Sequence, residues 1–243
     1  MYNTPIFDID SLSVSFQKGV YLLKSLTYTV NRNDFIVILG SNGSGKTTML
    51  KTLNGTVTNY SGHIKLFNRF EVKKLSHKVI SKHIGTITQN IEDSLFIEFS
   101  LAQNFQMYME AFDDDKDIKD FLQLLSNINS KLVDLMEAKV STLSGGEKQC
   151  FLLCLNLFLK RDLLLLDEHT SALDPKTAQE VMAMTADNLS SNNITCIMTT
   201  HSLDDAIKYG NRLIIMQNGQ IIQTFDGQQK YNLSKSDLLQ YYY

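Results

Sequence analysis

One short segment, GSNGSGKTT at residues 40–48, constrains this chain more than any other part of its sequence. It follows the apolar run FIVIL at residues 35–39 and precedes the helix-compatible stretch TTMLKTL. A β-branched run, a Gly-rich turn and a helix former in this order predict a strand, a tight loop and a helix. The segment fits the pattern G-x-x-x-x-G-K-[ST], whose fixed positions are Gly40, Gly45, Lys46 and Thr47.

The chemistry that this loop favours is the capture of an anion. Glycines let several backbone N–H groups point into the loop, and the N-terminus of the following helix adds the positive end of its dipole. We expect Lys46 to reach the β- and γ-phosphates of a nucleotide and the Thr47 hydroxyl to ligate Mg²⁺. A Gly-rich turn that carries a lysine by chance is the simpler alternative. The other residues expected to contact the nucleotide are Ser41, Asn42, Gly43, Ser44 and Thr48.

Length and composition set outer limits on the chain. Its 243 residues can form one large α/β domain or two small ones, and 43% hydrophobic with 20% charged residues is ordinary for a globular protein. A net charge of −3 does not mark it as a nucleic-acid or membrane-surface binder. MYNTPIFDID lacks the basic region of a signal peptide. The longest apolar run, residues 151–166, is interrupted by charges and is too short to span a bilayer, so any span must come from another chain.

Three further groups of residues suggest chemistry but have simpler explanations. Cys150, Cys154 and Cys196 lie in apolar runs and are expected to be buried free thiols of a reducing cytosol. The first two lie one helical turn apart, so a metal pair is conceivable, but core packing is the favoured interpretation. The acidic triplet at residues 113–115 is more typical of a solvated loop than of a cation site. The basic stretch at residues 69–82 is expected to be a solvated face.

The pattern of apolar residues predicts an α/β chain. Alternation at residues 6–16 and 26–30 indicates half-buried antiparallel strands, and wholly apolar runs indicate buried parallel strands. From residue 100 to about 138 the spacing turns helical, so that a helical segment is inserted between strands. Further strands are expected at residues 63–67, 84–88, 163–166 and 193–200, and a hairpin at residues 212–224.

Two carboxylates and a histidine end apolar strands. LLLL at residues 163–166 is followed by Asp167 and Glu168, and the run NITCIMTT at residues 193–200 is followed by His201. The carboxyl edge of an open α/β sheet is where ligands bind. Taken alone, the carboxylates could equally be an ordinary turn, and a single histidine is usually structural.

Five elements now stand in order, namely GSNGSGKTT, Gln89, LSGGEKQ at residues 143–149, LLLLDE at residues 163–168 and His201. With these motifs the sequence resembles the nucleotide-binding subunit of ATP-binding-cassette (ABC) transporters, from about Leu12 to Gly227. LSGG is the specific signal, because it distinguishes this family from other P-loop NTPases. The resemblance implies a P-loop NTPase core with a mainly parallel sheet, an N-terminal antiparallel β-subdomain and an inserted α-helical subdomain. The implied limits are residues 1–90 and 148–243 for the first two and 91–147 for the third.

The resemblance also assigns roles to single residues. It implies that Asp167 holds the Mg²⁺ shell, that Glu168 orients or deprotonates the attacking water, and that His201 contacts the γ-phosphate, since phosphoryl transfer depends on positioning. Gln89 is expected to line the metal and the water and to signal to membrane subunits. Phe16 stands where the family places an aromatic ring against adenine; a residue in a core strand is its alternative.

One chain is not expected to complete this site. The LSGG segment opens a helix, and the N–H groups of Ser144 and Gly146 would form a second anion cradle for ATP held by a partner's loop. Gly145 between them is also expected to contact that ATP. Asp174, in the motif SALD, is expected to contact the partner protomer across the dimer interface. The resemblance therefore implies a head-to-tail homodimer with two ATP molecules, which closes on ATP and reopens after hydrolysis.

Some positions depart from the family pattern. His169 replaces the proline usual after the glutamate, and Cys150 and Leu155 stand where many members have arginines. None of these changes removes a phosphate, metal or water contact, so an ATPase is still expected. DEHTSALDPKTA, residues 167–178, resembles a branch that imports small organic solutes, with amino acids one possibility, and that works with an extracytoplasmic solute-binding protein.

The leading functional hypothesis is a transport ATPase, peripheral on the cytoplasmic side of the membrane, that docks onto separate permease subunits and binds no nucleic acid. The alternative is a soluble single-cassette ABC ATPase for assembly, without a transport substrate. A cassette that acts in envelope release or division is a third option. The identity of neighbouring genes or of a co-purifying permease would discriminate between them.

Overall fold

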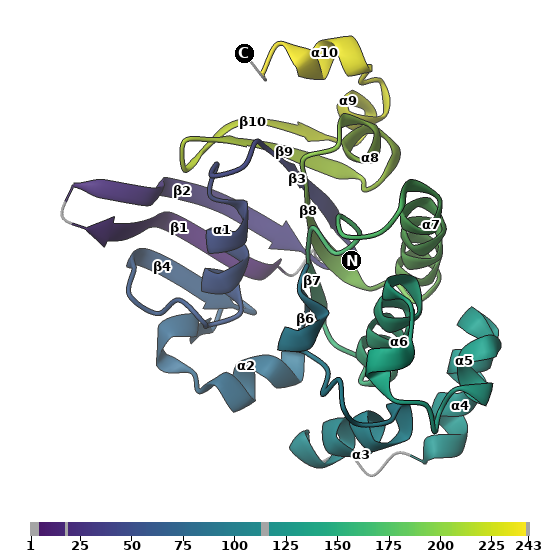
Figure 1. Cartoon of the computed structure of the whole chain (residues 1–243). Helices are drawn as coiled ribbons and strands as arrows, with labels where there is room; N and C mark the ends of the chain where they lie inside the picture. Colours follow the sequence, from purple (N-terminus) through teal and green to yellow (C-terminus); the bar gives the residue numbers. More distant parts are fainter. Residues whose placement is uncertain (1–4, 18, 113–116, 242–243) are drawn as a thin grey trace. The chain divides into compact units, whose positions relative to one another are not determined.

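The computed structural model describes residues 5–17, 19–112 and 117–241 (Figure 1). Its chain forms two compact units. The first unit comprises parts of residues 1–84, with 162–167 and 193–243, and the second comprises parts of residues 85–161 with 168–192. Neither unit is a continuous stretch of sequence, because the chain leaves the first unit twice and returns to it twice.

The first unit contains an antiparallel sheet. Its strands are β1 (Pro5–Gln17), β2 (Val20–Asn31), β4 (Ser61–Leu66) and β5 (Phe70–Glu71), in the order β2-β1-β4-β5. Phe7 and Ile9 of β1 are fully buried while Asp8 between them is partly exposed, which is the alternation of a strand with one face on the core. The predicted antiparallel strands are confirmed, and they extend further than the alternation indicated.

A second sheet in this unit is mainly parallel. Its strands within the unit are β3 (Phe35–Leu39), β7 (Leu163–Asp167), β8 (Thr195–Thr200), β9 (Arg212–Gln217) and β10 (Gln220–Asp226), in the order β10-β9-β3-β8-β7. β3 pairs parallel with β8 and β9, β7 pairs parallel with β8, and only the hairpin partner β10 is antiparallel. β7 and β8 are buried along almost their whole length, as expected of parallel strands covered on both faces. The α/β fold with a mainly parallel sheet is therefore confirmed.

Short helices complete the first unit. After β3 comes α1 (Lys46–Leu53), and the turn η1 (Val72–Lys74) and α2 (His77–His83) follow β5. The buried face of α1, formed by Met49, Leu50 and Leu53, packs into one apolar cluster with Ile36 and Ile38 of β3. Burying such side chains stabilises a fold by roughly 1.5–3 kcal/mol each, so the loop between β3 and α1 is held at both ends.

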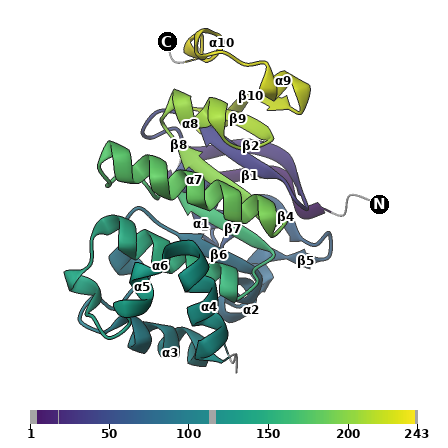
Figure 2. The ribbon, with the colours of Figure 1, turned by 90° about the vertical axis from the view of Figure 1, so that its right-hand side faces the viewer.

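The C-terminal part of the first unit packs on α8 (Leu203–Lys208). The helices α9 (Gln228–Tyr231) and α10 (Lys235–Leu239) follow β10 and lie near α8 (Figure 2). Lys230 Nζ donates a hydrogen bond of 2.6 Å to the Ile207 carbonyl, and Leu238 is fully buried. The Tyr-rich end of the chain thus begins in packed structure, and its last two residues lie outside the described residues.

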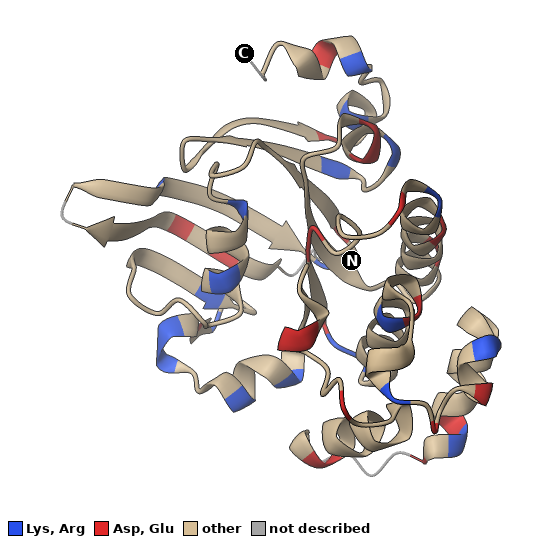
Figure 3. Ribbon diagram, viewed as in Figure 1, with Lys and Arg blue, Asp and Glu red and all other residues tan. Residues whose placement is uncertain are grey.

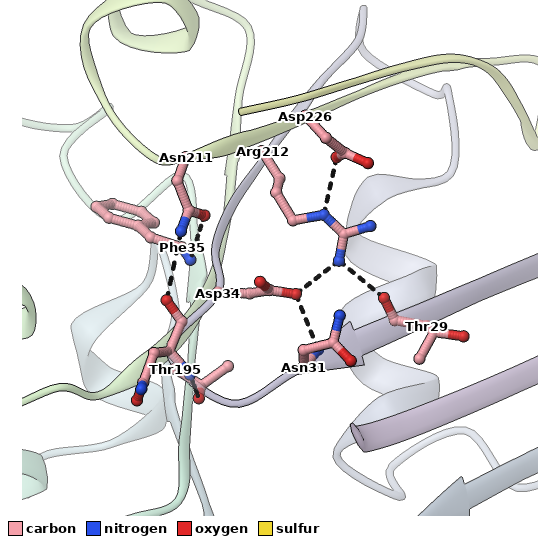
Figure 4. A network of polar contacts seen from close by, with 9 residues as sticks. Thr29, Asn31, Asp34, Phe35, Thr195, Asn211, Arg212 and Asp226 are labelled. Carbon is pink, nitrogen blue, oxygen red and sulfur yellow. Dashed lines mark hydrogen bonds and ion pairs between the residues drawn. The ribbon is translucent and has the colours of Figure 1, made fainter. Parts of the chain in front are cut away.

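A polar network fastens the two sheets of the first unit at the start of β3 (Figure 4). Asp34 Oδ2 accepts hydrogen bonds from Arg212 Nη1 at 2.6 Å and from the Asn31 N–H at 2.8 Å. Arg212 also donates to the Thr29 carbonyl at 2.9 Å and to Asp226 Oδ1 at 2.8 Å. Because these side chains are mostly buried, the guanidinium and the Asp34 carboxylate need each other as partners.

The second unit is mainly helical. It holds most of β6 (Ile84–Ile87), the turns η2 (Ile91–Asp93) and η3 (Val140–Thr142), and five α-helices among the described residues. These helices are α3 (Leu101–Ala111), α4 (Ile118–Asn129), α5 (Lys131–Asp134), α6 (Gly145–Phe158) and α7 (Pro175–Ser191). The inserted helical segment is thus confirmed as helical, whereas its predicted limits at residues 91 and 147 stay a prediction.

Aromatic side chains form the centre of the second unit. Phe121 of α4 stacks on Phe105 of α3 with ring centroids 4.6 Å apart, and it meets Phe151 and Phe158 of α6 edge-on at 5.7 and 5.4 Å. Offset and edge-to-face pairs of this kind add about 0.5–1.5 kcal/mol beyond the apolar area that they bury. The cluster therefore fixes α6 against α3 and α4.

The simpler sequence interpretations are largely upheld. The three cysteines are free and buried. The lysines of η1 and α2, whose positions are blue on the ribbon of Figure 3, are exposed, as expected of a solvated face. The acidic triplet lies outside the described residues. No helix in the described ranges is long and apolar enough to cross a membrane.

Candidate nucleotide-binding site

The loop after β3 has a backbone that requires glycine. Gly43 and Gly45 have φ values of 80° and 104°, in the left-handed region that side chains disfavour. A Cβ atom at Gly40 would lie 2.5 Å from both the Met216 carbonyl and Ser44 Oγ. The loop therefore forms a tight turn in which the backbone itself lines the space.

Lys46 lies across this loop. Its Nζ donates hydrogen bonds to the carbonyls of Gly40 at 2.8 Å and Ser41 at 3.3 Å, and the residue is only 5% exposed. A nearly buried ammonium group offers a strong attraction to an anion in the loop. Ser44 Oγ is buried and has no hydrogen-bond partner within the described part of the chain, and a phosphate oxygen would satisfy it. The residues present thus fit a bound polyphosphate.

A second set of oxygen atoms lies beside the loop. Thr47 Oγ1, on the first turn of α1, donates a hydrogen bond of 3.1 Å to Asp167 Oδ1 at the end of β7. Thr199 Oγ1, on β8, donates to the same carboxylate oxygen at 2.7 Å. Hydroxyl and carboxylate oxygens are the ligands that Mg²⁺ prefers. Thr47 and Asp167 therefore lie close enough to share one ion, and their role as its ligands stays a prediction.

Thr199 was missed by the sequence reasoning. The register of the parallel pair places Thr199 opposite Asp167, so its hydroxyl orients the carboxylate. A threonine near the end of an otherwise apolar strand was the available signal, because a buried hydroxyl needs a partner.

Gly219 was also missed as part of the site. Its N–H donates to the Ser44 carbonyl at 3.0 Å, and its carbonyl accepts from the Lys24 N–H at 2.8 Å. Asn218 and Gly219 form the turn between β9 and β10 with φ values of 50° and 76°, typical of a tight hairpin. Because it is hydrogen-bonded both to the loop at residues 40–48 and to β2, this turn supports the loop and connects it to that strand.

His201 directly follows β8 at the same edge of the sheet. Thr200, the last residue of β8, pairs in register with Leu39 of β3, and its carbonyl accepts a hydrogen bond of 3.4 Å from the Gly40 N–H. Ser202 then caps α8 by accepting from the Asp205 N–H at 3.2 Å. The described backbone therefore holds the residues on either side of His201.

Phe16 is not a core residue. It lies near the end of β1 and its side chain is 73% exposed, so the alternative interpretation as a buried strand residue is wrong. Leaving a phenylalanine in water forgoes roughly 1.5–3 kcal/mol of burial. Its contact with adenine stays a prediction.

The second unit carries the signature segment at the start of α6. Ser144 and Glu147 form a capping box, with the Ser144 N–H donating to Glu147 Oε2 at 2.8 Å and the Glu147 N–H donating to Ser144 Oγ at 3.3 Å. A Cβ at Gly145 would lie 2.7 Å from Leu173 Cδ2, and one at Gly146 would lie 2.5 Å from Thr177 Cγ2. The glycines thus allow α6 to approach the segment that opens α7.

Asp174 has a structural task within this unit. Its Oδ1 accepts a hydrogen bond of 3.1 Å from the Thr177 N–H and caps α7. The hydrogen bonds from Thr177 hold the pKa of the Asp174 carboxyl below its usual range. The predicted contact across a dimer interface remains a prediction.

Glu168 and His169 open the same part of the second unit. Glu168 has a φ of 46°, and its carbonyl accepts from the Ser171 N–H at 2.9 Å and the Ser171 hydroxyl at 2.8 Å. His169 is buried, which lowers its pKa to about 4, and its Nε2 has no hydrogen-bond partner among the described residues. The imidazole is therefore neutral at pH 7.

The predicted site residues are divided between the two units. Those of the first unit are Phe16, the loop at 40–48, Asp167 and His201, of which Thr47 and Asp167 are in direct contact. The residues of the second unit are Gln89, which is exposed after β6, with Ser144, Gly145, Gly146, Glu168 and Asp174.

This chain is similar to known proteins both in sequence and in structure. Residues 23–171 match the family model described as ABC transporter. The chain is 30% identical to the tyrosine transport ATP-binding protein of Clostridioides difficile, over 97% of this chain and 98% of that protein. It is 32% identical to the phosphonates import ATP-binding protein PhnC of Mesoplasma florum, over 92% of this chain and 94% of that protein. A dimeric post-hydrolysis structure of the ATP-binding cassette MJ0796, bound to ADP and Pi, has the same fold, with a TM-score of 0.75, 20% identity and coverage of 90% and 98%.

Proposed function

Since this chain belongs to the ABC transporter family, and is thus an ATP-binding ATPase of a transport system, we propose that it energises the import of a small organic solute of the amino-acid class through separate permease subunits. The tyrosine transport protein, which matches nearly the whole length of this chain, supports the amino-acid class. The observation that carries the chemical part of the proposal is the hydroxyl–carboxylate pair of Thr47 and Asp167 beside the Lys46 loop.

Each predicted site residue of the first unit has a role in binding ATP or Mg²⁺. The N–H groups of the loop, Lys46 and Ser44 bind the phosphates of ATP, because they present donors and a positive charge to one small space. Thr47 and Asp167 hold Mg²⁺, with Thr199 keeping the carboxylate oriented. Bound Mg²⁺ neutralises charge that develops on the transferred phosphoryl group. Phe16 stacks on the adenine ring.

Hydrolysis needs groups that position water and stabilise charge. Glu168 orients or deprotonates the attacking water, His201 contacts the γ-phosphate, and Gln89 contacts the water and the metal. These roles follow from the family and from the places of these residues at strand ends, where ligands of open α/β sheets bind.

The proposed assembly is a head-to-tail homodimer. The helix α6 begins at Ser144, which is exposed and caps the helix, and a helix N-terminus favours a phosphate. In the dimer, the residues Ser144–Gly146 of one protomer contact the ATP in the loop of its partner. ATP then favours the closed dimer because only that state offers both sets of contacts.

An apolar platform in the second unit is the proposed docking site for a permease. Phe96 and Phe99, which follow the Gln89 segment, stack with centroids 5.8 Å apart and are 54% and 42% exposed. The fully buried Asn104 holds this segment, accepting from the Phe96 N–H at 2.8 Å and donating to its carbonyl at 3.0 Å. A rigid pair of exposed aromatic side chains is typical of a protein interface.

Co-purification tests the transport proposal. A tagged chain extracted from membranes in mild detergent should bring down a multi-span permease, and vesicles that contain both should take up labelled tyrosine or a related amino acid only with ATP. A double change of Phe96 and Phe99 to serine should release the permease while basal ATP hydrolysis persists. Phe70→Ser, which alters an aromatic side chain with similar exposure in the first unit, is the matched control.

Two results would count against the proposal. Recovery of only water-soluble partners would favour the alternative of an assembly ATPase without a transport substrate. Uptake of solutes of another class, with no competition by amino acids, would leave the transport ATPase in place but refute the amino-acid class. The proposed location is peripheral, on the cytoplasmic face of the membrane, where ATP is supplied, and an extracytoplasmic solute-binding protein is the expected further partner.

A further inference from the structure

The C-terminal helices of the first unit are joined to α8 by a buried lysine. Lys230 of α9, a helix that lies beside α8 in Figure 1, is only 1% exposed, and its Nζ donates a hydrogen bond of 2.6 Å to the Ile207 carbonyl. The helix α10 also packs on α8, and Lys235 Nζ lies 2.9 Å from Asp204 Oδ2 at the surface. Two lysines of the C-terminal segment thus contact α8, one from the interior and one at the surface.

The acceptor of Lys230 is one of the carbonyls that a helix leaves unpaired. The helix α8 ends at Lys208, so the Ile207 carbonyl belongs to its last turn, where no later N–H of the helix can reach it. A cation at this end also interacts favourably with the negative end of the helix dipole. Burial lowers the pKa of Lys230, and no carboxylate in the described part of the chain pairs with it. The Ile207 carbonyl is therefore the group that compensates the buried ammonium.

The position of α8 depends on contacts of this kind. The helix has six residues, and helices this short are not stable by themselves in water. Its first turn is held by the cap at Ser202, and Ala206 in its middle is fully buried. The bond from Lys230 holds the last turn. Because a hydrogen-bonded helix moves as one rigid element, a shift of the last turn reaches the first.

His201 lies directly before this helix. Only Ser202 separates it from Leu203, the first residue of α8. The Ser202 N–H donates a hydrogen bond of 2.9 Å to Thr200 Oγ1 at the end of β8, so His201 lies on a tight turn between the strand and the helix. A change in the position of α8 therefore moves the residue at the tip of this turn.

We propose that Lys230 is a positioning residue for His201. Lys230 holds the last turn of α8, and α8 sets where the His201 imidazole lies relative to the γ-phosphate of ATP in the loop at residues 40–48. This inference rests on the contact of His201 with the γ-phosphate in the proposed function. It adds a residue that lies outside all five motifs, and it gives the C-terminal helices a part in ATP hydrolysis.

Steady-state ATP hydrolysis by the full chain tests this role. Lys230→Met keeps a long, unbranched side chain in the buried position but cannot donate to the Ile207 carbonyl. Its kcat should fall by about 10–100-fold, because a small displacement of a group that acts on the transition state is costly. The KM for ATP should stay unchanged, because the loop at residues 40–48 keeps its own contacts. Lys230→Arg, which retains a cationic donor, should recover part of the loss.

Lys235→Met is the matched control. It makes the same substitution in the same segment and removes a contact with the same helix, but the Lys235 and Asp204 side chains are 56% and 76% exposed. Exposed ion pairs contribute little, so its kcat should equal that of the unchanged chain. Melting curves establish that each variant is folded. If Lys230→Met does not fold, Lys230→Gln takes its place, since its shorter side chain stays polar and does not reach the carbonyl.

A double variant separates positioning from a general structural effect. His201→Ala should lower kcat by about 10²-fold, and adding Lys230→Met should lower it no further, because two changes that act through one group are not additive. An unchanged kcat in folded Lys230→Met would overturn the proposal, as would an equal further loss in the His201→Ala chain. An unchanged kcat in His201→Ala alone would refute the proposed role of His201 itself, and this inference with it.

Discussion

Thr47 and Asp167, which are 120 positions apart in the chain, are joined by a hydrogen bond of 3.1 Å between the Thr47 hydroxyl and Asp167 Oδ1. The parallel register brings them together, since the loop after β3 and the end of β7 lie at one edge of the sheet with β8 between the two strands. The contact places one neutral and one anionic oxygen ligand side by side. It is the structural basis of the Mg²⁺ site that we propose.

Removing either member of this pair should abolish the stimulation of ATP hydrolysis by Mg²⁺. In Thr47→Ala and Asp167→Asn, ATP hydrolysis should fall by about 10²–10³-fold, because the metal that neutralises developing charge is no longer held. Thr199→Val should lose less, since it only orients Asp167. The measurement is the rate of phosphate release against Mg²⁺ concentration. A normal Mg²⁺ dependence in Asp167→Asn would contradict the assignment.

Gly219→Ala should weaken ATP binding although Gly219 is outside the phosphate motif. A Cβ there would lie 2.5 Å from the Leu22 carbonyl at a φ of 76°, so the turn must shift and its bond to the Ser44 carbonyl must lengthen. We expect a loss of about 1–3 kcal/mol in stability from the strained backbone and a higher Kd for ATP. Calorimetry and a melting curve measure the two effects.

Gly227→Ala is the control for this change. Gly227 also has a positive φ, 51°, but nothing lies within 4 Å of a Cβ there. It should therefore show backbone strain without the loss of ATP affinity. Equal ATP affinities in the two variants would show that the hairpin turn does not support the loop.

Arg212→Met should destabilise the first unit by about 3 kcal/mol, because it leaves the mostly buried Asp34 carboxylate without its cation. The matched change is Lys235→Met, which removes the exposed ion pair with Asp204 and should cost less than about 1 kcal/mol. Adding Asp34→Asn to Arg212→Met should recover part of the loss, since the uncompensated charge is gone. Denaturant unfolding measures these differences, and equal effects of the two single changes would contradict the importance of the network.

The sequence was sufficient for features that depend on local patterns. The strand, loop and helix at residues 35–53, the apolar strand before Asp167 and the hairpin around Asn218 are each encoded in a few neighbouring residues. Their apolar runs and glycines leave few other conformations. The family motifs named Thr47 and Asp167, which lie in hydrogen-bond contact in one unit; that they hold Mg²⁺ stays a prediction.

Features that depend on long-range register were not predictable from the sequence. The bond between Thr199 and Asp167, the support of Ser44 by Gly219 and the bond between Lys230 and Ile207 each join separate elements. No periodicity reports such contacts, because they follow from how strands and helices pair after folding. The exposure of Phe16 likewise needed the structure, since the alternation of β1 fitted a buried ring equally well.

The central claim is that ATP in the loop at residues 40–48 joins two copies of this chain through the Ser144–Gly146 segment of the partner. Analytical ultracentrifugation of Glu168→Gln, which should bind ATP without hydrolysing it, tests this most directly. We predict that Glu168→Gln is a dimer with ATP and Mg²⁺ and a monomer without ATP. Adding Lys46→Ala should leave it monomeric because ATP no longer binds. Adding Ser144→Arg should also leave it monomeric, although this chain still binds ATP. A Glu168→Gln chain that binds ATP and stays monomeric, or a dimer that Ser144→Arg leaves intact, would contradict the account.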